Sequence, residues 1–203
     1  MKLYKNLSLA LKEKDEVFAI KLSLKGTFPK DLYHLPYLKE VYLEGSCKEF
    51  YFEKHHWLKL KTLSIKWEDF SGDLSELFTL PGLENLKIID TPLKKIILPL
   101  GTIPASLKFL TIKNCGLETL PEEISMLGGL KELFLPGNKL SELPYSFCEL
   151  ANLKRLNIDS NQFFTFPNVI KKMPHLKSVS ADHNLFNEIE KARIEREFNL
   201  TVE

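Results

Sequence analysis

The chain has 203 residues, of which 44% are hydrophobic and 27% charged, and this composition is typical of a folded protein with one large core. The formal net charge of +1 gives no general attraction for nucleic acid or for an anionic membrane. No apolar run reaches the roughly 20 residues that span a bilayer. We therefore expect neither a nucleic-acid partner nor membrane insertion.

The start of the chain and its cysteines bear on the compartment. Charged residues follow Met1 too soon to leave the apolar core of a signal peptide. Three widely spaced cysteines, Cys47, Cys115 and Cys148, indicate a reducing compartment without a disulfide framework. The prediction is a cytoplasmic protein if Met1 is the native start. If a leader was removed, a secreted or cell-surface protein is the alternative.

A repeated pattern of about 23 residues runs along most of the chain. Its period is typical of a stacked-repeat protein, a solenoid in which each coil packs on the next. The regular half is C-terminal, and the spacing drifts in the N-terminal half. The first residue of each repeat is apolar, and these residues are Val17, Leu38, Leu60, Leu83, Leu107, Leu130, Leu153 and Leu176.

Each predicted element follows from its place in the repeat. Apolar residues at the fourth and sixth positions alternate, which predicts a short strand with one face inward. Successive strands should then stack as a parallel sheet. Apolar residues follow at the eleventh and fourteenth positions, and a proline often comes next, as at Pro121, Pro144 and Pro167. The segments that return the chain carry apolar residues three apart, which predicts one or two helical turns on the convex side.

The ninth position holds asparagine in the last three repeats, at Asn138, Asn161 and Asn184. A carboxamide both donates and accepts hydrogen bonds, so it can satisfy turn backbone groups of its own coil and of a neighbouring coil. We expect these three residues to form a structural asparagine ladder.

The ends of a solenoid must be covered. Residues 1–16 are predicted to form an N-terminal cap with an amphipathic helix over residues 3–13. Residues 17–186 then form about eight repeats. Residues 187–203 form a C-terminal cap, with a helix over 188–198 that offers Ile189, Ile194 and Phe198 to the last coil, followed by a short strand in NLTVE. The chain is predicted to be a single domain.

The pattern LxxLxLxxNxLxxLP resembles that of the leucine-rich repeat family, and is most similar to the 23-residue class of bacterial proteins and Ras-suppressor-type scaffolds. The match is strong from Leu107 to Ile189 and partial from Val17 to Leu107. Residues 48–60, 66–74 and 94–106 depart from it. The resemblance implies an α/β fold, a right-handed horseshoe with the parallel sheet on its concave face, short helical or 3-10 turns on its convex face, and capped ends.

The resemblance also implies a binding surface on the concave face. Phe109 and Phe134 fall on adjacent predicted strands and should form one apolar contact spot. Tyr42 and Trp67 are assigned to a second spot, although Trp67, in a drifted repeat, suits the core equally well. Aromatic and arginine side chains dominate interface energetics. The predicted concave-face binding residues are Tyr42, Trp67, Lys87, Phe109, Lys113, Phe134, Arg155 and Asn157.

Other functions find little support in the residues. Lysines at the second position form a ladder that discourages edge pairing and aggregation more readily than it binds phosphate or glycan. His55 and His56 lack metal-ligand spacing, and no catalytic motif occurs. We predict no enzyme activity, metal or cofactor, and a monomer that binds a protein partner. The alternatives are an adhesin or effector that binds host protein or glycan, a metal or enzyme site in residues 48–70, and, from the resemblance alone, regulation of a small GTPase.

Overall fold

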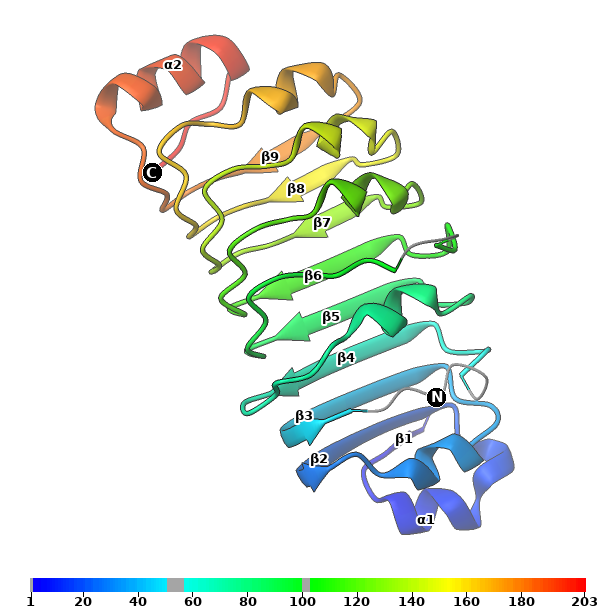
Figure 1. The fold of residues 1–203 in the computed structure, drawn as a ribbon. Helices are drawn as coiled ribbons and strands as arrows, with labels where there is room; N and C mark the ends of the chain where they lie inside the picture. The colour runs from blue at the N-terminus through cyan, green and yellow to red at the C-terminus, as the bar shows by residue number, and fades with distance from the viewer. Residues whose placement is uncertain (1, 51–56, 100–102) are drawn as a thin grey trace.

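The computed structural model describes residues 2–50, 57–99 and 103–203. Across these residues, nine parallel strands form a single open sheet in chain order. The return segments lie along one face of the sheet and leave the other face uncovered (Figure 1). This arrangement confirms the predicted solenoid. The strands are β1 Leu3–Tyr4, β2 Ala19–Thr27, β3 Glu40–Glu49, β4 Thr62–Trp67, β5 Asn85–Ile89, β6 Phe109–Lys113, β7 Glu132–Phe134, β8 Arg155–Asn157 and β9 Ser178–Ser180.

Short helical segments connect the strands. The predicted turns on the convex side are 3-10 helices, with one α-helix near each end of the chain (Figure 1). The described helices are α1 Leu7–Lys12, η1 Lys14–Glu16, η2 Lys30–His34, η4 Ser75–Thr79, η5 Glu122–Met126, η6 Tyr145–Glu149, η7 Asn168–Lys172 and α2 Glu188–Phe198.

The strand register follows the phase of the repeat. The residues of β6 pair with the corresponding residues of β7, so that Leu110 lies beside Leu133 and Thr111 beside Phe134. The inward fourth and sixth positions are buried from β2 to β8, as at Leu133 and Leu135, which are 0% exposed. Burying a leucine side chain contributes about 1.5–3 kcal/mol, so a slip of one residue would expose a whole row of them.

Trp67 corrects the prediction for the N-terminal half. It is completely buried and does not belong to the concave surface. The strands are longer here than in the regular repeats, and β4 continues to Trp67. Because side chains alternate along a strand, Leu63, Ile65 and Trp67 all point into the core.

Aromatic side chains fill the core in this part of the molecule. Phe50 lies with its ring centroid 4.7 Å from that of Phe28 and 5.2 Å from that of Trp67. The Trp67 ring lies 5.3 Å from that of Phe70. Aromatic side chains therefore fill the core where the repeat pattern drifts.

The three asparagines of the ninth position each join neighbouring coils. Asn138 accepts hydrogen bonds from the backbone N–H groups of Cys115 and Leu117, both at 3.1 Å. It donates to the carbonyls of Ile112 and Leu135, at 2.8 and 2.9 Å. One side chain thus satisfies buried groups of two coils. Asn161 likewise accepts from the Leu140 N–H and donates to the carbonyls of Leu135 and Ile158. Asn184 accepts from the Phe163 N–H and donates to the carbonyls of Ile158 and Ala181.

Smaller side chains make fewer bonds at the same position in earlier coils. The Thr91 hydroxyl accepts from the Trp67 N–H at 2.9 Å and donates to the Ile89 carbonyl at 3.0 Å. The Cys115 thiol donates weakly to the carbonyls of Ile88 and Lys113, at 3.4 and 3.1 Å. The connection between coils is therefore weaker before Asn138 than after it.

The N-terminal cap differs from the predicted helix over residues 3–13. Residues Leu3–Tyr4 form β1, which pairs with the start of β2. The helix α1 begins only after Asn6, whose side chain accepts a hydrogen bond from the Leu9 N–H at 3.0 Å. An asparagine at this position favours the start of a helix, so it divides the cap into a strand and a short helix.

The helix α2 covers the other end. Asn187 caps it by accepting from the Glu190 N–H at 2.9 Å, and Ile194 is fully buried. Ile189, predicted to cover the last coil, is instead 83% exposed. At about 100° per residue, it lies about 140° around the helix from Ile194.

Glu190 fastens α2 to the preceding coil. Its carboxylate accepts a hydrogen bond from the Phe166 N–H at 2.7 Å and pairs with Arg193. The bond to the Arg193 guanidinium, aided by that from the Phe166 N–H, lowers the pKa of Glu190.

The last residues follow the path of a further coil. No strand is formed over residues 199–203, contrary to the prediction, but the His183 N–H donates to the Glu203 carbonyl at 3.1 Å. The Glu203 N–H donates to the Asp182 carboxylate at 3.0 Å, just as the Asp182 N–H donates to Asp159 at 2.9 Å. Glu203 therefore repeats the place of Asp182 one coil further on.

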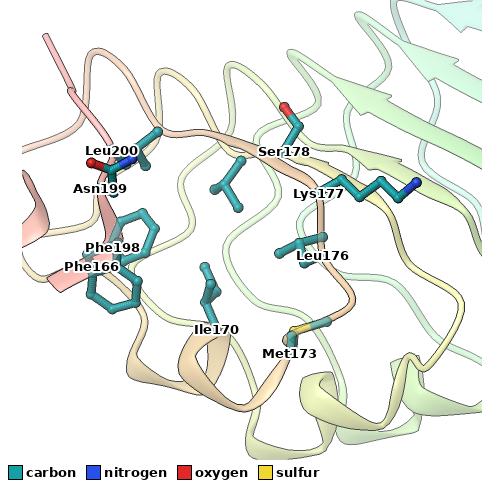
Figure 2. Close-up of a pocket in the computed structure, with 10 residues that line it drawn as sticks. Phe166, Ile170, Met173, Leu176, Lys177, Ser178, Phe198, Asn199 and Leu200 are labelled. Atoms are coloured by element: carbon teal, nitrogen blue, oxygen red, sulfur yellow. The ribbon is translucent and has the colours of Figure 1, made fainter.

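A pocket of about 380 Å³ separates this cap from the last coil. Figure 2 shows Phe166 and Phe198 side by side, facing Ile170 across it, whereas Lys177 points away. Leu176 is only partly buried, although the corresponding Leu153 is completely buried. The C-terminal cap therefore covers the last coil less tightly than one coil covers another.

The first prediction concerns the asparagine ladder. Replacing Asn161 by Ala leaves buried donors and acceptors of two coils without partners, and should lower the free energy of unfolding by about 1–3 kcal/mol. Chemical denaturation followed by circular dichroism measures this. The control is Asn152→Ala, which removes one exposed hydrogen bond to the Gly128 carbonyl. Equal stabilities of the two variants would contradict the role given to Asn161.

The second prediction concerns pH. Because the folded pKa of Glu190 is lowered, its ion pair stabilises the fold above the ordinary glutamate pKa of about 4.3. This stabilisation is lost as the pH falls through the lower folded value. Glu190→Gln should therefore reduce the melting temperature at pH 7, and the difference from wild type should shrink at about pH 3 and below.

The matched control is Glu188→Gln, since the Glu188 side chain is 88% exposed and pairs with Lys191. Differential scanning calorimetry across this pH range should show a small and constant difference for it. A difference for Glu190→Gln that does not depend on pH would mean that its carboxylate charge does not hold the cap.

Candidate functional site

The open face of the sheet presents two outward columns of side chains that run across the strands. The strand register sets both columns. The first, at the third position, contains Ala19, Glu40, Thr62, Asn85, Phe109, Glu132, Arg155 and Ser178. The second, at the fifth position, contains Lys21, Tyr42, Ser64, Lys87, Thr111, Phe134, Asn157 and Ser180.

One pocket lies within these columns, over β5, β6 and β7. Its volume is about 180 Å³. Phe109 and Phe134 sit at diagonal corners, because Phe109 pairs with Glu132 and Phe134 pairs with Thr111. We call this the concave pocket, and it is lined by Asn85, Lys87, Phe109, Leu110, Thr111, Glu132 and Phe134.

The structure thus brings three of the predicted binding residues, Lys87, Phe109 and Phe134, around one hollow. Both phenylalanine rings are half-buried, and no ring contact joins them among the described aromatic pairs. They are apolar walls of a hollow, and each leaves part of its surface open to a partner.

The sequence prediction did not select four residues of this pocket, Asn85, Leu110, Thr111 and Glu132, and Asn85 is the one with an unusual environment. Its carboxamide oxygen is buried and accepts no hydrogen bond in the structure. An unpaired buried acceptor costs about 1–3 kcal/mol, and buried polar groups in folded proteins almost always have partners. A ligand that donates a hydrogen bond to this oxygen would remove that cost if the Asn85 side chain turned toward the pocket. The only signal in the sequence was a polar residue at an outward position of the repeat.

Acidic side chains around the pocket are already neutralised. Glu84 pairs with Lys108 at 2.8 Å and with Lys61 at 2.9 Å, and these two ammonium groups lower its pKa to about 2. Glu132 pairs with Arg155. The basic ladder of the second position therefore serves in part to balance charge between coils.

Two of the predicted binding residues are lysines that, unlike Lys61 and Lys108, form no ion pair with a described carboxylate. Lys87 and Lys113 are exposed, and neither has an ion-pair partner among the described residues. Asp90 lies near Lys113 but pairs with Lys66 at 2.8 Å. The region around the concave pocket therefore carries positive charge that no carboxylate of the described chain neutralises by direct contact.

The remaining predicted residues lie outside the pocket. The Tyr42 hydroxyl donates to Glu40 at 3.0 Å, and burial together with Glu40 raises its pKa. With Trp67 in the core, no ring contact among the described residues joins Tyr42 to another aromatic side chain that could complete the predicted second spot. Asn157 donates to Asp159 at 2.6 Å, and Arg155 is held by Glu132. These side chains are engaged in contacts within the protein.

Neither the histidines nor Cys115 forms a metal or nucleophile site among the described residues. His55 and His56 lie outside the described residues. Within the described ranges, no group of three histidine, cysteine or acidic side chains is arranged to hold a metal ion. Cys115 is buried, and burial raises the pKa of its thiol to about 11, so it is a poor nucleophile.

In the part of the chain that the structure covers, no helix has both the length and the apolar character needed to cross a bilayer.

Comparisons with known proteins agree with this architecture. A family model described as a leucine-rich repeat region matches residues 99–191. The mouse and human proteins named volume-regulated anion channel subunit LRRC8B are each 30% identical over 136 residues, which is 63% of this chain and 17% of theirs. The chain thus spans about a sixth of the length of these curated relatives.

Solved structures share the fold along most of the chain. A leucine-rich repeat protein of Leptospira interrogans is 23% identical with a TM-score of 0.56, covering 92% of this chain and 60% of its own. InlP of Listeria monocytogenes is 17% identical with a TM-score of 0.70, covering 90% and 55%. The plant peptide hormone receptor RGFR1 is 18% identical with a TM-score of 0.61, covering 90% and 30%.

These identities are too low to carry function, and they show the fold alone. A leucine-rich repeat region therefore spans residues 99–191, and the single parallel sheet in chain order with its repeat register gives the described chain the fold of a leucine-rich repeat solenoid.

Proposed function

We propose that the protein is a non-catalytic scaffold that binds a protein partner on the open, concave face of its sheet. The observation that carries this proposal is the concave pocket, where two half-buried phenylalanines flank a buried carboxamide oxygen that has no hydrogen-bond donor. Such a combination of apolar walls with a few polar groups is typical of a site that fixes a ligand's orientation.

The sheet provides a rigid platform for such contacts. Its strands are held by ladder bonds, and those from β6 to β9 also by the asparagines of the turns behind them, so little conformational freedom remains to be lost on binding. A standard protein interface covers about 800 Å² on each partner. Several adjacent strands can supply that area, and the concave pocket lies near the middle of the sheet, on β5 to β7.

The fold supports a binding role in other proteins. The plant receptor RGFR1 was solved in complex with RGF2, and PEPR1 with AtPEP1, both on this architecture. Leucine-rich repeats commonly bind proteins, and this chain carries such a repeat region over residues 99–191.

The third prediction tests the two phenylalanines. The double variant Phe109→Ala/Phe134→Ala should lose a partner that the wild-type chain retains in a pull-down from a lysate of the source organism. Central aromatic residues of an interface each contribute about 2 kcal/mol or more, which is roughly 30-fold in affinity for each. Surface plasmon resonance with the purified partner measures the loss.

The matched control is Phe164→Ala, since Phe164 is 67% exposed and lies in a loop outside the concave pocket. Circular dichroism must first show that both variants are folded. If the partner binds the double variant as well as it binds wild type, the site is not the concave pocket.

A further inference from the structure

We infer that the concave pocket recognises an acidic peptide segment, in which an apolar side chain is followed closely by a carboxylate. This inference rests on the proposed protein-binding function and names the chemistry of the partner. Three features of the pocket carry it: an apolar slot, an unmet hydrogen-bond acceptor and two unpaired cations on one side.

The slot takes the apolar side chain. Phe109 and Phe134 stand on neighbouring strands at diagonal corners, and Leu110 and Thr111 line the pocket between them. Its volume of about 180 Å³ suits one side chain and not an extended apolar surface. The aromatic walls give contact area on both sides of an inserted group.

The acceptor takes an N–H donor once the Asn85 side chain turns toward the pocket, since its oxygen is buried in the unbound structure. The Asn85 carboxamide oxygen lies beside Phe109, its pairing partner across β5 and β6, and has no donor of its own. A peptide with its side chain between the two rings has backbone N–H groups next to that side chain. The same bound residue can therefore fill the slot and satisfy Asn85.

The cations fix the sign of the partner's charge. Lys87 lies at the fifth position of its repeat, in β5, and pairs with Thr111 of β6. Lys113 follows Thr111 by two residues, at the end of β6. Residues two apart on a strand lie on the same face, so both lysines stand on the side of the pocket toward the strand ends. A carboxylate placed between them would meet two ammonium groups.

The surrounding charges disfavour a basic partner. Glu132 lines the pocket, but Arg155 neutralises it, and Glu84 is shared by Lys61 and Lys108. No carboxylate that lines the pocket therefore remains to attract a lysine or an arginine. Complementary charge increases association rate and specificity, and here complementarity requires an acidic segment.

The experiment uses the full chain, immobilised, to select from a displayed library of random octapeptides. We expect the selected peptides to share an apolar residue with aspartate or glutamate within two positions. A synthetic peptide of that consensus and its amide counterpart, with Asn or Gln for the acid, are then titrated by fluorescence polarisation. The acidic peptide should bind wild type at least tenfold more tightly than the amide peptide.

The double variant Lys87→Ala/Lys113→Ala should lose at least tenfold in affinity for the acidic peptide and no longer distinguish the two peptides. Such non-additivity shows that the acid and the lysines interact. The matched control is Lys139→Ala, an exposed lysine in the loop after β7, which should bind as wild type does.

The outcomes separate the two proposals. A consensus without an acid, or equal affinity of both peptides, overturns the acidic partner. If Phe109→Ala/Phe134→Ala still abolishes binding in that case, the proposed function stands. Peptides that bind this variant as well as wild type overturn both, and a library that yields no enriched sequence overturns the inference.

Discussion

The fold depends on how the tight turn after each strand satisfies its buried backbone groups. Such groups must be bonded, because each orphan donor or acceptor destabilises the fold. Asn138 does this for its own coil and the preceding one, with two accepted and two strong donated hydrogen bonds. Asn161 and Asn184 make corresponding bonds in the next two coils, so each of these repeats is fixed in the same phase as the one before it.

That common phase determines what the open face presents. Because leucines at the fourth and sixth positions must point inward, the third and fifth positions must point outward. Phe109 and Phe134 point outward for this reason, and the pairing of β6 with β7 brings them to opposite corners of one pocket. Lysines of neighbouring coils neutralise Glu84, so that the charge that remains near the pocket is that of Lys87 and Lys113.

The sequence predicted the repeat phase, the parallel sheet and the outward columns, because apolar spacing reports directly which side chains are buried. It failed where the outcome depends on strand length or on neighbours. Trp67 is buried because β4 continues past the usual strand end, which the spacing of leucines does not encode. Ile189 is exposed because Ile194, and not Ile189, turns toward the core. The unmet acceptor of Asn85 depends on the positions of side chains on adjacent strands, and no residue pattern reveals it.

The most direct measurement of the central claim is a crystal structure of the full chain with a peptide selected by binding to it. Our account predicts that an apolar side chain of the peptide lies between Phe109 and Phe134, with a peptide N–H about 3 Å from the Asn85 carboxamide oxygen. A peptide bound on the return segments, or in the pocket beneath α2, with the concave pocket empty, would contradict it.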